Sequence, residues 1–346
     1  MIEAIKCRIE KELKNYIRSL EKSYTLKKIS PPLFAHIKEF FLRKGKRVRP
    51  SLCVMGYLGY VKKPKPGLYS TALSLEFLHD FMLVHDDIID KSDTRRGKLS
   101  MHVLLNRYIS GHRGLKFDGE DLTIIIGDIM FALSMGAFLS IREEPKRKEK
   151  ALKKLIEAAA YTGSGEFIEL LSGLKEIDKI TKNDIYKIYD LKTARYTFSY
   201  PLAIGALLAG ANDKEIDKLI RYGLYLGRAF QIQDDILGMF GLEKDTGKST
   251  LTDLREAKKT LLILNAYKNS TLINRKLIKK ILRKKRADKT DLRTMRRLIL
   301  DSGALALAKK EISSSLKKAA KILASTFLLP AYKKTLGEFT RKIINY

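Results

Sequence analysis

The stretch HDDIID, residues 85–90, places three aspartates directly after the apolar residues 81–84. Charged groups beside apolar residues are costly unless a cation neutralises them. On a helix, Asp86 and Asp90 face the same way, about 6 Å apart along the axis, whereas Asp87 points aside. Oxygen-only ligation favours Mg²⁺, which often completes its shell with water and substrate phosphates. The stretch therefore predicts a site for Mg²⁺ and phosphate, although such acid pairs also occur on exposed helix faces.

A second acidic pair, Asp234 and Asp235, lies in FQIQDDILGMFG, residues 230–241. It follows a helical pattern whose apolar positions are Leu226, Phe230 and Ile232. Helix bundles commonly build metal sites from side chains on facing helices. The two patches are about 150 residues apart in the chain, so we expect them to face each other across a cavity and to hold Mg²⁺ ions around one diphosphate.

Basic segments accompany the acids. Arg95 and Arg96, in KSDTRRGK, carry guanidinium groups whose geometry suits phosphate oxygens. Further candidates are Lys46, Arg47 and Arg49 in RKGKRVRP at residues 43–50, the pair Lys192-Thr193, and Lys248. A metal site for one diphosphate and a separate basic pocket for another indicate two diphosphate substrates.

The elements that must position these residues are helices. No stretch shows sustained alternation bounded by hairpin turns, whereas apolar residues recur at three- and four-residue spacing in many segments. The clearest of these are residues 4–21, 68–90, 150–171, 183–192, 213–240 and 304–323. The breaks between them are short. We therefore expect one all-α domain over residues 1–346, a large helical bundle with buried central helices.

Composition bounds the class further. Cys7 and Cys53 are the only cysteines, too few for a disulfide framework, and the first residues show no signal-peptide core, so we expect a cytoplasmic protein. Residues 124–141 are long enough to span a bilayer, but Asp128 favours a core helix in which this acid is buried.

The net charge of +29 is large enough to attract phosphate polymers or anionic surfaces. Residues 275–297 contain twelve basic residues against Asp288 and Asp291, with apolar residues at helical spacing. We interpret the segment as one amphipathic helix with a solvated basic face, and we expect no nucleic-acid partner. A weak association with an anionic membrane surface stays open.

Together the motifs resemble those of the trans-isoprenyl diphosphate synthases, the polyprenyl synthetase family, from residue 43 to about 260. The matching stretches are GKRVRP at 45–50, DDIID at 86–90, RRG at 95–97, KT at 192–193, FQIQDD at 230–235, GKS at 247–249 and DLREAKKTLL at 253–262. Three positions depart from the family pattern. Gly238 stands where many members carry aspartate, Glu166 replaces a glutamine, and Ala257 stands where glycine is frequent.

The resemblance implies an isoprenoid-synthase bundle with a central cavity, Mg²⁺ as cofactor and a homodimer. It implies a prenyltransferase that joins isopentenyl diphosphate head-to-tail to a C5 to C15 allylic diphosphate. The metal ligands would be Asp86, Asp90 and Asp234, helped by Asp235. Isopentenyl diphosphate would bind Gly45, Lys46, Arg49, His79 and Arg96. The departing diphosphate would meet Arg95, Lys192, Lys248 and Lys258, the last of which fits a solvated lysine equally well. Thr193 and Gln231 would stabilise the allylic cation, and His85 would be a packing group.

Product length should depend on what blocks the tail cavity. By the resemblance, the chain grows away from Asp86, so the wall consists of Met82 and Phe81 and then Leu78. One helical turn, about 5.4 Å, is close to the length of one isoprene unit. A single aromatic residue resembles archaeal-type C20 enzymes, so we expect geranylgeranyl diphosphate as the main product. Farnesyl products, C25 and longer products, and a catalytically silent regulatory subunit are the alternatives. A terpene cyclase would share DDxxD, but the paired arginines and GKRVRP favour a second diphosphate substrate.

Overall fold

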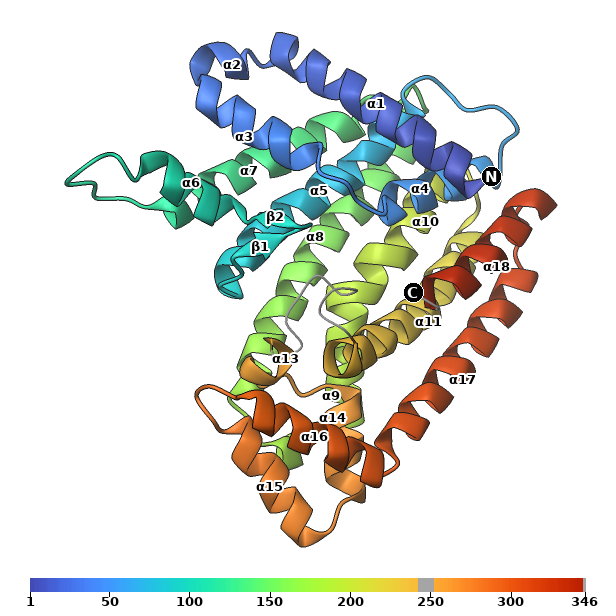
Figure 1. The fold of residues 1–346 in the computed structure, drawn as a ribbon. Coiled ribbons are helices and arrows are strands. Elements are labelled where there is room, and N and C mark those ends of the chain that lie inside the picture. The colour runs from blue at the N-terminus through green and yellow to red at the C-terminus, as the bar shows by residue number, and fades with distance from the viewer. Residues whose placement is uncertain (242–251, 345–346) are drawn as a thin grey trace. The chain divides into compact units, whose positions relative to one another are not determined.

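The computed structural model describes residues 1–241 and 252–344. Helices dominate it (Figure 1), and one two-stranded hairpin is the only sheet among the described residues. The expected all-α class is confirmed. The chain divides into two compact units, Met1–Lys153 with Ile204–Gly210 and Lys154–Ala203 with Ala211–Tyr346. The single domain over residues 1–346 and its central cavity stay predictions.

The first unit is built around two long helices, α5 and α7. Its elements are α1 (Ile2–Ser23), α2 (Leu26–Ile29), α3 (Pro31–Phe41), α4 (Val48–Leu58), α5 (Leu68–Ile89), β1 (Thr94–Arg95), β2 (Lys98–Leu99), α6 (Met101–Ile109), α7 (Gly119–Phe138), the start of α8 (Pro145–Gly173) and the end of α10 (Tyr200–Leu208). Helix α5 is buried on nearly every face over its first half, where most side chains are apolar. Ser134 of α7 donates a hydrogen bond to the carbonyl of Ser74 on α5 (2.7 Å). This packing fixes the axis of the helix that carries the first acidic motif.

Helix α7 differs from the expected buried helix. Among the described residues it is the one helix long and apolar enough to cross a membrane, and 44% of its apolar window is buried. One face packs along α5, whereas Ile124 and Ile125 on another face are exposed. Asp128 lies on this exposed face, so the prediction of a buried acid is wrong. The carboxylate is in contact with solvent because the helix is covered on one side only.

The second unit is arranged around α11. Its elements are the C-terminal part of α8 (Pro145–Gly173), η1 (Ile177–Lys179), α9 (Lys182–Ile188), η2 (Tyr189–Ser199), the start of α10 (Tyr200–Leu208), α11 (Asp213–Phe240), α13 (Thr252–Arg255), α14 (Leu261–Asn269), α15 (Leu272–Leu282), α16 (Lys289–Asp301), α17 (Ala304–Ala324) and α18 (Pro330–Ile344). Helix α11 packs against η2 and α17. A Cβ atom on Gly227 would lie 2.4 Å from the Cα of Ala194 in η2. Glycine therefore permits the close approach that joins the second acidic motif to η2.

The basic segment 275–297 forms two helices, α15 and α16, so the prediction of one continuous helix is wrong. Asp288 is the N-cap of α16, and its side chain accepts hydrogen bonds from the backbone N–H groups of Thr290 and Asp291. The side chain of Asp291 in turn accepts from the backbone of Asp288. The two acids that interrupt the basic run thus form a capping box that starts a new helix.

Candidate functional site

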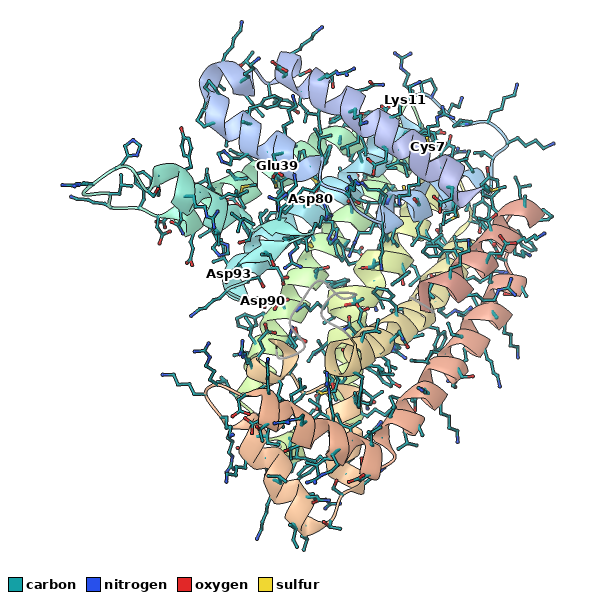
Figure 2. All side chains as sticks on the ribbon, viewed as in Figure 1. Cys7, Lys11, Glu39, Asp80, Asp90 and Asp93 are labelled. Atoms are coloured by element: carbon teal, nitrogen blue, oxygen red, sulfur yellow. The ribbon has the colours of Figure 1, made fainter. Side chains whose placement is uncertain are left out.

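The first acidic motif occupies the last turn of α5, near the C-terminal end of this helix in Figure 2. Asp86 and Asp90 are partly exposed, and Asp87 is fully buried. The last turn contains no basic residue. The helix dipole adds partial negative charge at this end, so the carboxylates and the backbone attract a cation together. Oxygen donors, partial exposure and this charge fit a hard divalent cation.

Arg95 lies directly beside this motif. Its Nε donates to Oδ1 of Asp87 (2.6 Å), and its Nη2 lies 3.2 Å from Oδ2 of Asp86. Burial lowers the pKa of Arg95, but the hydrogen bond to Asp87 and the charges of Asp87, Asp86 and Asp90 outweigh it, so the pKa lies above its ordinary value. Asp87 is therefore the buried anchor of Arg95, which leaves Asp86 and Asp90 as the exposed acids.

The hairpin β1–β2 presents the two arginines in different directions. Its strands pair Arg95 with Lys98, and the two turn residues Arg96 and Gly97 have φ values of 56° and 73°. Positive φ at both positions is typical of a type I′ turn, which suits the twist of a two-residue hairpin. Glu39 of α3 accepts from Lys98 (2.9 Å), which fastens the hairpin. The turn thus directs Arg96 away from the metal motif.

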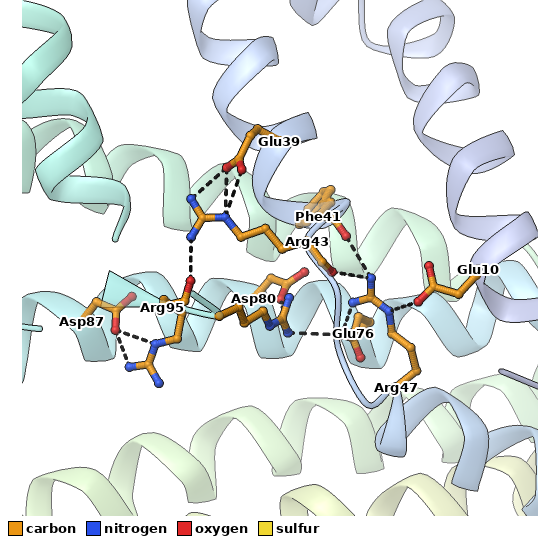
Figure 3. A network of polar contacts seen from close by, with 10 residues as sticks. Glu10, Glu39, Phe41, Arg43, Arg47, Glu76, Asp80, Asp87 and Arg95 are labelled. Atoms are coloured by element: carbon orange, nitrogen blue, oxygen red, sulfur yellow. Dashed lines mark hydrogen bonds and ion pairs between the residues drawn. The ribbon is translucent and has the colours of Figure 1, made fainter. Parts of the chain in front are cut away.

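Arg96 enters a buried network on α5. Its Nη2 lies 3.0 Å from Oδ1 of Asp80 and 3.3 Å from Oε1 of Glu76. Arg47, whose side chain is 0% exposed, donates to the same Glu76 oxygen (2.6 Å) and to Glu10 (2.8 Å), as Figure 3 shows. Arg47 is therefore a structural ion-pair partner, although the sequence placed it among the basic candidates for a phosphate. The Glu76 and Asp80 partners were missed, because nothing local links them to the hairpin.

The other predicted substrate ligands of the first unit lie around this network. A Cβ atom on Gly45 would lie 3.2 Å from Nη1 of Arg47 and 3.6 Å from Cζ of Arg96. Lys46 is exposed and Arg49 is partly exposed. Burial, followed by the charges of Arg49, Arg96, Arg95 and Arg47, holds the pKa of His79 well below 6.5. The imidazole is therefore neutral at physiological pH and can donate one hydrogen bond to an anion.

The expected chain-length residues lie on α5 before the acidic motif. Leu78 is fully buried, and Phe81 and Met82 are partly exposed. The Phe81 ring lies 4.8 Å from the ring of His85 and 5.4 Å from that of Phe131 on α7. His85 Nε2 lies 3.2 Å from the carbonyl of Ile124, so His85 packs on α7 as expected. Phe131 was missed because only the pairing of α5 with α7 brings it to Phe81.

In the second unit, Lys192 lies on η2, a segment with π-helical spacing. Its Nζ is 2.5 Å from Oε2 of Glu166 and 2.5 Å from Oε2 of Glu169, both on α8. Helical segments of this kind occur often at functional sites. The acid at position 166, a departure from the family pattern, is thus one of two carboxylates that compete with any substrate for Lys192.

Thr193 begins a chain of hydrogen bonds toward α11. Its hydroxyl donates to Oε1 of Gln231 (2.7 Å), and Nε2 of Gln231 donates to Oδ1 of Asp235 (3.0 Å). Tyr189 donates to the other oxygen of Asp235 and accepts from the backbone N–H of Leu261 (3.0 Å). Burial and then the charge of Asp235 raise the pKa of Tyr189, which stays protonated. Asp235 is buried and bonded through both oxygens, whereas Asp234 is exposed; the predicted metal role of Asp235 stays a prediction.

The remaining predicted residues follow α11. Lys258 Nζ lies 2.6 Å from Oε2 of Glu256, and Ala257 between them has a φ of 50°. The left-handed backbone explains why glycine suits position 257. Lys248 lies outside the described residues. The structure groups Gly45, Arg49, His79 and Arg96 in one unit, and Lys192, Thr193 and Gln231 in the other. The facing of the two acidic patches stays a prediction.

Known proteins resemble the chain in sequence and in fold. Residues 31–299 match the polyprenyl synthetase family model. A geranylgeranyl diphosphate synthase of Saccharolobus solfataricus is 32% identical, with 95% of this chain and 92% of that protein covered. A geranylfarnesyl diphosphate synthase of Aeropyrum pernix is 34% identical, with 84% and 87% covered. The structure of a geranylgeranyl pyrophosphate synthase from Corynebacterium glutamicum, complexed with isoprenyl diphosphate and magnesium, superposes with a TM-score of 0.89 at 25% identity, covering 99% of both chains.

Proposed function

The chain belongs to the polyprenyl synthetase family, and we propose that it extends allylic diphosphates with isopentenyl diphosphate to geranylgeranyl diphosphate. It is a prenyltransferase. The observation that carries the proposal is the acidic last turn of α5 beside the arginine hairpin. It combines ligands for a divalent cation with two guanidinium groups that point in different directions, which suits one enzyme with two diphosphate substrates.

Asp86, Asp90 and Asp234 are the proposed ligands of Mg²⁺. The donor set fits because Asp86 and Asp90 are partly exposed at the end of α5, whose last turn holds no basic residue, and Asp234 is exposed on α11. When bound, the metal would neutralise the diphosphate that leaves the allylic substrate. Arg95 would assist at the same diphosphate, because Asp87 holds its guanidinium beside Asp86. Lys192 and Lys258 would add positive charge as the C–O bond breaks.

Isopentenyl diphosphate would bind between Lys46, Arg49, His79 and Arg96. The neutral imidazole of His79 would donate a hydrogen bond, and Arg49 and Arg96 would supply charge. Gly45 would let the loop approach because a Cβ atom there would crowd Nη1 of Arg47. The double bond would then attack the allylic cation, and a proton would leave to the released diphosphate, so no protein nucleophile is needed.

Thr193 and Gln231 would stabilise the allylic cation by their dipoles. The Thr193 hydroxyl donates its hydrogen bond to Gln231, so the lone pairs of its oxygen can face the positive charge of the allylic cation. Tyr189 and Asp235 hold Gln231 from behind. The arrangement is preorganised, and therefore needs no rearrangement when charge develops.

The product assignment depends on the wall at Phe81. Phe131 thickens this wall, which favours a fixed stop and a C20 product. The resemblance to a geranylfarnesyl diphosphate synthase keeps a C25 product as the second candidate. A silent regulatory subunit is disfavoured, because Asp86, Asp90, Lys192 and Asp234 are all present.

Product analysis with Mg²⁺, isopentenyl diphosphate and C5, C10 or C15 allylic diphosphates tests the proposal. A C20 product from all three supports it, and Phe81→Ala should lengthen the product by one or more isoprene units. Leu83→Ala on the same helix is the control. A C25 product would mean that the tail cavity is blocked further from Asp86 than at Phe81. An unchanged product spectrum for Phe81→Ala would show that Phe81 does not block the cavity. No condensation by folded, metal-supplied protein would favour the silent subunit.

A homodimer is proposed from the exposed apolar face of α7, where Ile124 and Ile125 lie, and from the exposed Leu139 directly after this helix. Light scattering that finds only monomers would contradict it.

Cytoplasmic location stays a prediction that rests on the cysteine content. Weak attraction of α15 and α16 to anionic membranes is a prediction that rests on their positive charge. Flotation with anionic vesicles at low and high salt would test the latter.

A further inference from the structure

Asp80 is an acid for which the proposed reaction has no role. It lies on α5 one turn after Glu76 and is 0% exposed. Its Oδ1 is 3.0 Å from Nη2 of Arg96. Oδ1 makes only this ion-pair contact, and neither Oδ1 nor Oδ2 has a hydrogen-bond partner among the described residues. A buried carboxyl without a hydrogen bond is costly in its charged form, so its presence beside a proposed substrate ligand needs a reason.

The charges around Asp80 come from four elements. Glu76 is on α5 itself, Arg96 comes from the hairpin, Arg47 from the start of α4, and Glu10 of α1 acts through Arg47. Arg49 of α4 and His79 of α5 belong to the same unit. Glu76 already bonds both guanidinium groups. If Asp80 were also ionised, the positive charge of Arg96 would be cancelled by its own protein neighbours.

Burial decides between the two acids. The charges of Arg47, Arg96 and Arg49 overcome the burial of Glu76 and hold its pKa below the ordinary value. For Asp80, burial and then the charge of Glu76 outweigh Arg96 and Arg47, and the pKa rises to about 8. One proton is thus kept in the cluster at neutral pH, and it resides on Asp80.

We propose that Asp80 is a positioning residue that sets the affinity of Arg96 for diphosphate. The inference rests on the proposed function, in which Arg96 binds isopentenyl diphosphate. Protonated Asp80 holds the guanidinium group of Arg96 in place by contact, and the positive charge of Arg96 stays available to the substrate. Ionised Asp80 competes with the substrate for the same charge. Binding of diphosphate therefore takes up a proton when Asp80 is ionised beforehand.

The pH dependence follows from this linkage. Below pH 8 Asp80 is already protonated, and its titration does not affect affinity. Above pH 8 the affinity falls as the free protein loses the proton, up to about tenfold per pH unit. His79 is neutral over this whole range, because its pKa lies well below 6.5. It therefore adds nothing to the slope.

Titration calorimetry of the full-length protein with inorganic diphosphate, without Mg²⁺, from pH 6.5 to 9.5 tests the inference. We expect wild-type affinity to fall above pH 8, with up to one proton taken up per diphosphate when two buffers of different ionisation enthalpy are compared. Asp80→Asn keeps the shape and an acceptor for Arg96, and should remove both effects. Glu10→Gln, a change in the same network that does not touch Arg96, should keep them.

Steady-state kinetics separate positioning from folding. At pH 9, Asp80→Asn should lower KM for isopentenyl diphosphate several-fold relative to wild type, with kcat and the allylic KM unchanged. Equal pH dependence in wild type and Asp80→Asn, or no proton uptake by wild type, would overturn the inference and leave the proposed function intact. Absence of diphosphate binding at every pH would overturn both. Inorganic diphosphate also exchanges protons in this pH range, so the uptake is counted as the difference between wild type and Asp80→Asn, with Asp80→Ser as the second variant if the first does not fold.

Discussion

Arg96 in the first unit and Lys192 in the second are each held by two carboxylates. Glu76 and Asp80 around Arg96 are almost completely buried, whereas Glu166 and Glu169 around Lys192 are 16% and 22% exposed in their side chains. Charges interact more strongly where water is excluded, and one acid of a buried pair resists ionisation. Partly exposed acids are screened by solvent and salt. Each cation thus has two acidic neighbours, but the charge that Arg96 offers to a substrate depends on pH, whereas the charge that Lys192 offers depends on salt.

The largest expected effect comes from removing a buried cation. Arg47→Ala leaves Glu76 without its shortest ion pair, and the free energy of unfolding should fall by about 3–5 kcal/mol. Lys192→Ala should change it by less than about 1 kcal/mol, because its partners are partly hydrated. Urea unfolding at pH 7 measures both. Equal losses would break the comparison.

Asp80→Asn should stabilise the protein in a pH-dependent way. Folding raises the pKa of Asp80 from 3.8 to about 8. Between these values the unfolded chain is ionised and the folded chain is not, so wild-type stability falls as pH rises from 4 to 8 and then levels off. The variant should be nearly equal to wild type near pH 4, and its advantage should grow by up to about 1.4 kcal/mol per pH unit toward pH 8. Thermal unfolding that shows a constant difference across this range would contradict the assignment.

Glu166→Gln sharpens the comparison in the second unit. The change leaves Lys192 with Glu169 alone, so the lysine should hold the allylic diphosphate more tightly. We expect KM for the allylic substrate to fall about two- to fivefold at low salt, the size of one partly exposed ion pair. Glu149→Gln, whose partner is the exposed Lys153, is the control on the same helix. An effect that persists at high salt would show that screening is not the cause.

The smallest expected effect concerns the backbone near a third cation. Ala257 has a left-handed φ of 50° between Glu256 and Lys258, which form an ion pair. Ala257→Gly removes the strain of this conformation but increases the conformational entropy of the unfolded chain. The free energy of unfolding should therefore rise by less than about 1 kcal/mol. Urea unfolding measures it. An unchanged KM would show that the backbone strain is separate from diphosphate binding, whereas a clear destabilisation would contradict the strain.

The long helices were predictable from the sequence. Apolar spacing placed a helix at 213–240 and another at 68–90, and the structure has α11 over Asp213–Phe240 and α5 over Leu68–Ile89. The acidic motif was also readable, because its i, i+4 spacing and apolar lead-in are local features. Periodicity failed at residues 283–288, where a capping box had to be recognised within a basic run.

The buried network was not predictable, because its members come from four separate segments. Asp80 differs from an ordinary helix acid only through Arg96 and Glu76, and those contacts need the hairpin and α4 in place. Phe131 reaches Phe81 only when α7 packs on α5. The sequence therefore identifies the basic and acidic residues of the site, whereas the competition of Glu76 and Asp80 for the charge of Arg96 depends on the tertiary structure.

The π-helical spacing of η2 sets a limit on insertions and deletions. Each residue turns a helix by roughly a quarter of a full turn, so removing one residue from η2 would move Thr193 or its neighbours to a different face. Ala194 and Ser199 are also fixed by the glycines of α11, which leave no slack for a compensating shift. The number of residues in η2 therefore cannot change without breaking the hydrogen bond from Thr193 to Gln231.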